Sequence, residues 1–204
     1  MIRAVFWDFG GVILTSPFDA FNEYELVKGL PVDFLRGVNT RDPDTNAWAR
    51  FERRELSAAE FDALFADESE SHGHRVAGAD LIAMLSGTVR PEMVKALDEV
   101  IAAGYLTACL TNNVESDARP EVEAVMARFD HVIESSKVGV RKPEVAFYEL
   151  ACRTAGVEPD EVVFLDDLGI NLKPAKAMGM TTIKVVSAAQ AIADLGTVLG
   201  LDLA

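Results

Sequence analysis

The amino-acid sequence predicts an α/β protein whose core is a doubly wound parallel sheet with an inserted all-helical subdomain. Three observations support this prediction. Short segments rich in Val, Ile and Phe recur along the chain, helical patterns separate the later ones, and a long stretch after the first segment has helical patterns alone. Strands that alternate with helices form right-handed crossovers, and these cover both faces of a parallel sheet.

Five segments have the apolar, β-branched composition of buried strands. They are Ile2–Trp7, Leu106–Leu110, His131–Glu134, Val162–Leu165 and Thr181–Val186. Because each is short and has little polar alternation, we expect each to be covered on both faces.

Three helices are predicted between the later strands, at Pro91–Ala103, Pro143–Ala155 and Leu172–Met178. Proline suits the first helical position, and a glycine after the last turn suits the left-handed cap of a helix. A glycine follows each of the three patterns directly, at Gly104, Gly156 and Gly179.

The stretch between the first and second strands breaks this alternation. One helix start is well marked there, because Ser57 and Glu60 have the spacing of a capping box. Pro17 and Gly87 punctuate the two ends of the stretch. We therefore predict a core of residues 1–15 and 88–204 and an inserted helical cap of residues 16–87.

Composition excludes several classes of protein. The chain has 204 residues, 50% of them hydrophobic, and its 19 Lys and Arg against 33 Asp and Glu give a formal net charge of −14. For such an acidic chain we expect neither a nucleic acid nor an anionic membrane surface as a partner, because their phosphates would repel it. Cys109 and Cys152 lack the spacing of a redox or metal motif. Without a leader-like start or a long apolar run, a cytoplasmic protein is expected.

Polar side chains follow the predicted strands at the edge where parallel sheets bind ligands. Asp8 comes directly after the first strand. The second strand is followed by Thr111 and Asn112, and the fourth by Asp166 and Asp167. Because the carboxyl ends of parallel strands meet at one edge, we expect these side chains to share a crevice.

A lysine completes this set, because Lys142 lies on the connection that leaves the third strand. Taken singly, each residue also fits a turn, a helix cap or a solvated helix start. Taken together they favour a site. Adjacent aspartates aimed at a third carboxylate repel one another unless a cation lies between them, and Mg²⁺ prefers oxygen ligands. A lysine and a hydroxyl beside that cation suit phosphate oxygens.

These residues resemble the motifs of the haloacid dehalogenase superfamily, in the subfamily with a helical cap after the first motif. Four motifs occur in order: DFGGV at 8–12, LTNN at 110–113, the lysine of VGVRKP at 138–143, and FLDDLGINLKPAKAMGM at 164–180. The last run is similar to the phosphatase domain at the N-terminus of soluble epoxide hydrolases. The resemblance implies a Rossmann-like core with strand order 3-2-1-4-5.

The resemblance also implies a catalytic role for Asp8 and a metal site around it. Asp8 would be the nucleophile that takes a phosphoryl group. Mg²⁺ would be held by Asp8, the main-chain carbonyl of Gly10, Asp167 and, through water, Asp166. The expected activity is hydrolysis of a small phosphorylated metabolite.

Four further residues receive roles from the same resemblance. Thr111, the Asn112 backbone and Lys142 would hold the phosphate oxygens, and Lys142 would also offset the charge of Asp8. Asn171 would orient the acidic pair or a bound water. Neither the particular substrate nor the oligomeric state is indicated by these motifs.

One position departs from the phosphatase pattern. Phosphatases of this superfamily carry a second aspartate two residues after the nucleophile, as general acid and base, and this chain has Gly10 there. Two alternatives therefore stay open. One is a metal-independent 2-haloacid dehalogenase, because halide leaves without a proton. The other is a non-catalytic protein that binds a phosphorylated ligand or a partner. The acidic pair Asp166–Asp167 favours the phosphatase, because without a cation it would lie uncompensated beside Asp8.

Overall fold

The computed structural model describes residues 1–85, 87–114 and 119–203, which form two compact units. The first comprises Met1–Thr15 and Thr88–Ala204, and the second comprises Ser16–Gly87. Among the described residues, every helix is too short or too polar to span a membrane.

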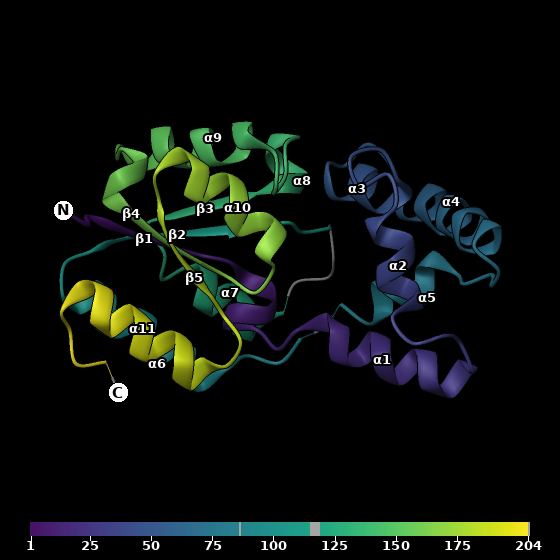
Figure 1. The fold of residues 1–204 in the computed structure, drawn as a ribbon, viewed down its shortest axis with the longest axis horizontal. Coiled ribbons are helices and arrows are strands. Elements are labelled where there is room, and N and C mark those ends of the chain that lie inside the picture. The colour runs from purple at the N-terminus through teal and green to yellow at the C-terminus, as the bar shows by residue number, and fades with distance from the viewer. Residues whose placement is uncertain (86, 115–118, 204) are drawn as a thin grey trace. The chain divides into compact units, whose positions relative to one another are not determined.

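The first unit is built on a parallel five-stranded sheet with strand order β3-β2-β1-β4-β5 (Figure 1). This confirms the predicted α/β sheet and the strand order that the resemblance implied. The strands are β1 (Ala4–Trp7), β2 (Leu106–Thr111), β3 (His131–Glu134), β4 (Val162–Asp166) and β5 (Thr181–Lys184).

Some strand limits differ from the predicted ones, because pairing decides where a strand begins and ends. β1 begins at Ala4 rather than Ile2, since Ala4 pairs with the first residues of both neighbouring strands. At the other edge the last pair joins Asp166 to Lys184, so β4 extends one residue further and β5 ends before Val186.

Helices cover both faces of the sheet, and successive strand residues serve opposite faces. In β1, Val5 and Trp7 pack in one apolar cluster with α6 (Pro91–Ala102) and α11 (Ala188–Leu199). Ala4 and Phe6 pack in a second cluster with α9 (Val145–Ala155) and α10 (Gly169–Met178). Figure 1 shows these two helix pairs on opposite sides of the sheet. The unit also contains α7 (Pro120–Met126) and α8 (Ser135–Val138), with the short turns η1 (Phe9–Ile13) and η2 (Pro159–Glu161).

Two of the predicted helices begin elsewhere. α9 begins at Val145, two residues after the proline expected to open it, because Glu144 is still extended. α10 begins at Gly169, before the predicted Leu172, and includes Pro174. Glycine is a poor helix former in isolation, so Gly169 concealed the first turn of α10 from the local sequence.

The second unit contains only helices among its described residues. These are α1 (Pro17–Lys28), α2 (Phe34–Thr40), α3 (Ala47–Glu52), α4 (Ala58–Ser71) and α5 (Gly78–Ala83). The predicted capping box at Ser57 and Glu60 opens α4. Aromatic rings form its core, in which Phe51 and Phe61 stack with centroids 4.4 Å apart and Trp48 meets Phe61 edge-on.

Candidate active site

The predicted site residues lie at the carboxyl ends of three adjacent strands. Asp8 follows β1, Thr111 ends β2 and Asp166 ends β4. Since β1 lies between β2 and β4, the strand order reverses around Asp8. Such a switch point is where open parallel sheets bind ligands.

The ammonium of Lys142 is the centre of this group. Its Nζ lies 2.7 Å from Asp8 Oδ1 and 2.8 Å from Asp166 Oδ2, and the side chain is 1% exposed. Asp8 Oδ1 also accepts from the Phe9 N–H at 2.6 Å. A single buried cation therefore contacts two of the three carboxylates.

Asp166 is surrounded by donors from the protein itself. Besides Lys142, its oxygens accept from the Leu168 N–H at 2.8 Å and from Asn171 Nδ2, which lies 3.1 Å from each of them. The helix that carries Asn171 is fixed in turn by Tyr148, whose hydroxyl donates to the Asn171 carbonyl at 2.7 Å. Asp166 thus binds Lys142 and Asn171 into one buried network.

Two glycines allow the β1 loop to approach the acidic pair. Gly11 has φ +76°, and a Cβ there would lie 2.2 Å from Asp167 Oδ2, so a side chain at this position would collide with the carboxylate. Gly10 differs, since its φ of −69° and ψ of 132° suit any residue and a Cβ would meet nothing within 4 Å. The packing therefore requires glycine at position 11 but not at position 10.

Several contacts of the site were not predicted from the sequence. Asn112 pairs its side-chain amide with the backbone of Lys142, and Arg90 donates to the Gly11 carbonyl at 2.9 Å. These partners lie 30 and 79 residues apart in the chain. No local sequence pattern predicts contacts between residues so far apart. The only signal in the sequence is that the side chains of Asn112 and Arg90 are polar.

The three carboxylates crowd together, and the pKa values of Asp8 and Asp167 are raised. One oxygen each of Asp8, Asp166 and Asp167 lie within 4.8 Å of one another. Burial raises the pKa of Asp8 well above its ordinary value, against the influence of Lys142, and Asp166 and Asp167 raise it further. Burial and the charge of Asp166 raise the pKa of Asp167 to about 6.

The pKa of the Lys142 ammonium is also raised, but for a different reason. Burial alone would lower the pKa of its ammonium, but Asp166 and Asp8 together raise it above its usual value. Three carboxylates lie together, and the charges of Lys142 and Arg90 act on them, so negative charge is still in excess. Buried charge must be paired, and an all-oxygen donor set with a negative excess fits a divalent cation such as Mg²⁺.

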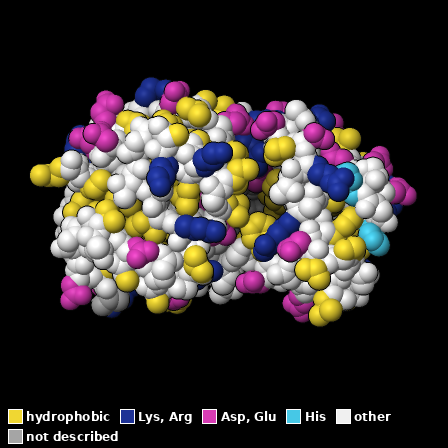
Figure 2. Space-filling view, viewed as in Figure 1, with side chains coloured by type: hydrophobic (Ala, Val, Ile, Leu, Met, Phe, Trp, Pro, Cys, Tyr) yellow, Lys and Arg dark blue, Asp and Glu magenta, His cyan; other side chains and the backbone are white. Residues whose placement is uncertain are grey.

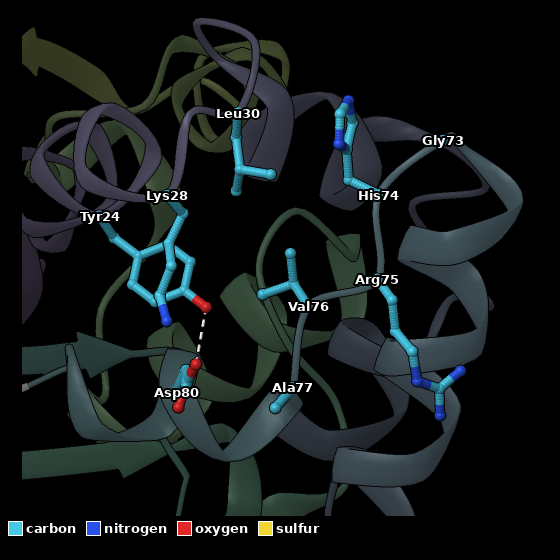
Figure 3. A pocket seen from close by; sticks show the side chains of 9 residues that line it. All are labelled: Tyr24, Lys28, Leu30, Gly73, His74, Arg75, Val76, Ala77 and Asp80. Carbon is cyan, nitrogen blue, oxygen red and sulfur yellow. Dashed lines mark hydrogen bonds between the residues drawn. The ribbon is translucent and has the colours of Figure 1, made fainter.

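The helical unit has a cavity of its own. It has a volume of about 510 Å³ and includes Tyr24, Lys28, Leu30, Val76 and Asp80 (Figure 3). The Tyr24 hydroxyl donates to Asp80 Oδ2 at 2.6 Å, and the Lys28 ammonium lies 5.4 Å from the centre of the Tyr24 ring. These polar groups of the cavity therefore already have partners within the protein.

Charged side chains of both signs are interspersed over the surface in view (Figure 2). The prediction that nucleic acids and anionic membranes are not partners rests on the net charge of −14 and stays a prediction.

Comparison with known proteins identifies the family. Residues 2–179 match the family model of the haloacid dehalogenase-like hydrolases. The chain therefore belongs to this family and is a hydrolase, which confirms the resemblance drawn from the four motifs. Bifunctional epoxide hydrolase 2 of Mus musculus is 33% identical over 217 residues, which cover 98% of this chain and 39% of that protein.

Two solved structures share the fold. A haloacid dehalogenase family enzyme of Bacteroides thetaiotaomicron, in complex with magnesium and inorganic phosphate, has a TM-score of 0.59 at 19% identity, covering 90% of this chain and 94% of its own. The L-2-haloacid dehalogenase of Xanthobacter autotrophicus, with chloropropionic acid covalently bound, has a TM-score of 0.60 at 21% identity, covering 100% of this chain and 85% of its own.

The chain spans less than half the length of the curated relatives that are at least 30% identical to it over most of its residues.

Proposed function

We propose that this hydrolase is a Mg²⁺-dependent phosphatase that cleaves a small phosphomonoester through an aspartyl-phosphate on Asp8. The observation that carries the proposal is the cluster of three carboxylates around the single ammonium of Lys142. A carboxylate that attacks an anionic phosphate must first have the repulsion between them cancelled. The excess negative charge at Asp8 provides a reason for a divalent cation.

Asp8, Asp167 and the Gly10 carbonyl would hold the metal, and Asp166, whose oxygens accept from protein donors, would act on it through water. Mg²⁺ there would neutralise charge on the phosphate oxygens. The helical unit Ser16–Gly87 is proposed to serve as the cap.

The reaction has two steps. An Asp8 oxygen attacks phosphorus, the bond from phosphorus to the leaving oxygen breaks, and an aspartyl-phosphate forms. Water then attacks that phosphorus and releases phosphate, which restores the Asp8 carboxylate. Lys142, together with Thr111 and the Asn112 backbone, would hold the phosphate oxygens in both steps. The substrate is proposed to be a small phosphorylated metabolite.

The test is phosphate release from para-nitrophenyl phosphate, with Mg²⁺ and with a chelator, alongside halide release from a 2-haloacid. Chelator-sensitive phosphate release supports the phosphatase. The glycine at position 10 favours a second candidate, a metal-independent dehalogenase, because halide leaves without a proton. Metal-independent halide release would establish that candidate. Inactivity in both assays, with inorganic phosphate still bound, would indicate a binding protein.

Gly10→Asp is expected to accelerate hydrolysis of alkyl phosphates relative to aryl phosphates. The backbone at position 10 accepts a side chain, and its Cβ would enter open space. A carboxyl group there would protonate a poor leaving group, and such an acid contributes about 10²-fold or more when well placed. The measurement is the ratio of kcat/KM for an alkyl and an aryl phosphate. Gly10→Asn, which has the same shape and no acid, is the control. An equal ratio in all three proteins would contradict the expectation.

Mg²⁺ is expected to stabilise the folded protein more at about pH 8 than at about pH 5. Because the pKa of Asp167 is raised to about 6, the folded state binds this proton more tightly than the unfolded chain does. The stability that this proton contributes to the folded state is present in acid and is lost as the pH rises through about 6. Mg²⁺ competes with that proton, so its stabilising effect appears over the same range.

The measurement is the thermal midpoint with and without Mg²⁺ at both pH values. In Asp167→Asn the Mg²⁺-dependent increment should disappear. Increments of equal size at both pH values in the unmodified protein would argue against a cation at Asp167.

A further inference from the structure

The backbone of Lys142 is held by the side chain of Asn112. The Lys142 N–H donates to Asn112 Oδ1 at 2.8 Å, and Asn112 Nδ2 donates to the Lys142 carbonyl at 2.9 Å. Lys142 lies between α8 and α9, outside the helices and strands. One side chain from the end of β2 thus fixes the backbone from which the buried ammonium extends.

An amide is well suited to this contact. The N–H and C=O of one residue call for an acceptor and a donor side by side, and the side-chain amides of Asn and Gln present both without charge. Asn112 also has a rigid base, because Thr111 before it is paired with Glu134 across the sheet. The contact therefore holds the backbone of Lys142 at a fixed place relative to β2.

The neighbouring Asn113 uses the same chemistry elsewhere. Its Nδ2 donates to Glu134 Oε1 at 2.8 Å, and its Oδ1 accepts from the Ser136 hydroxyl at 2.9 Å. These contacts join the same loop to the end of β3 and to α8 and do not involve Lys142. Asn113 therefore offers a matched control, with the same side chain one residue along.

We propose that Asn112 is a positioning residue, whose side-chain amide holds Lys142 so that its ammonium meets both Asp8 and Asp166. The consequence for turnover rests on the proposed function, in which Lys142 offsets the charge of Asp8. The positioning role does not rest on the proposed function, because it concerns only where the ammonium of Lys142 lies.

Turnover is the first measurement. For para-nitrophenyl phosphate with Mg²⁺, Asn112→Ala is expected to lower kcat/KM by about 10- to 100-fold, since small displacements of catalytic groups have effects of this size. Asn112→Ser, which keeps one polar atom near the Lys142 backbone, should lose less and serves if the alanine variant does not fold. Asn113→Ala should remain within about threefold of the unmodified protein.

The NMR resonance of the Lys142 ammonium is the second measurement, and it does not depend on activity. A buried, ion-paired ammonium exchanges slowly and gives a ¹H–¹⁵N signal. This signal should shift or broaden in Asn112→Ala and stay unchanged in Asn113→Ala. An unchanged signal in Asn112→Ala, or equal changes in both variants, would overturn the proposal. If the signal changes as expected while the unmodified protein releases no phosphate, the proposed function fails and the positioning role stands.

Discussion

Asp8→Asn is expected to abolish phosphate release while leaving the protein folded. The amide cannot form the aspartyl-phosphate, so kcat should fall by roughly 10³-fold or more, as when other covalent enzymes lose their nucleophile. The fold should tolerate the change. Burial already raises the pKa of Asp8, so the carboxylate form is disfavoured there. An asparagine oxygen can still accept from the Phe9 N–H, and Lys142 retains Asp166.

The measurements are phosphate release and the unfolding midpoint without Mg²⁺. We expect a midpoint equal to or above that of the unmodified protein, because one of three crowded carboxylates is gone. A variant that keeps a tenth of the activity would mean that another group attacks phosphorus. A folded but inactive variant would assign the loss to chemistry rather than to misfolding.

Lys142→Met is expected to cause the largest loss of stability among single changes in the site. Methionine has about the same length and removes the ammonium that contacts Asp8 and Asp166. Removing one partner of a buried ion pair costs about 3–5 kcal/mol, because the remaining charge stays buried without compensation. Turnover should be lost as well, since the charge of Asp8 is no longer offset.

The measurement is the free energy of unfolding in urea without Mg²⁺. Lys95→Met is the control, because that exposed ammonium lies 3.8 Å from Glu99 and such surface pairs contribute about 1 kcal/mol or less. Adding Asp8→Asn to Lys142→Met should restore part of the lost stability, since it removes one uncompensated carboxylate. A cost as small as that of the control would mean that Lys142 is not essential to the charge balance.

Much of the site followed from local sequence patterns. Alternating strands and helices, together with polar residues at the strand ends, predicted that Asp8, Thr111 and Asp166 would meet at one edge of a sheet. The structure brings them to the ends of β1, β2 and β4. This inference works because parallel strands place their carboxyl ends together whatever their separation along the chain.

Other features depend on contacts between distant segments. The side chain of Asn112 binds the backbone of Lys142, 30 positions further along the chain. The Tyr148 hydroxyl donates to the Asn171 carbonyl, 23 positions further along. Strand limits such as Ala4 were set by the neighbouring strands. Side-chain polarity alone does not choose among the partners that folding makes available.

Gly10 and Gly11 show what the sequence determines and what only the tertiary structure determines. The sequence by itself determined the fold class, the family motifs and the absence of a second aspartate after Asp8. Only the tertiary structure decided that Gly11 is required, because Asp167 occupies the space of its side chain, whereas Gly10 has room for one. The physical reason is that a motif records which residue is present, and the packing of distant residues around it determines which others the position could accept.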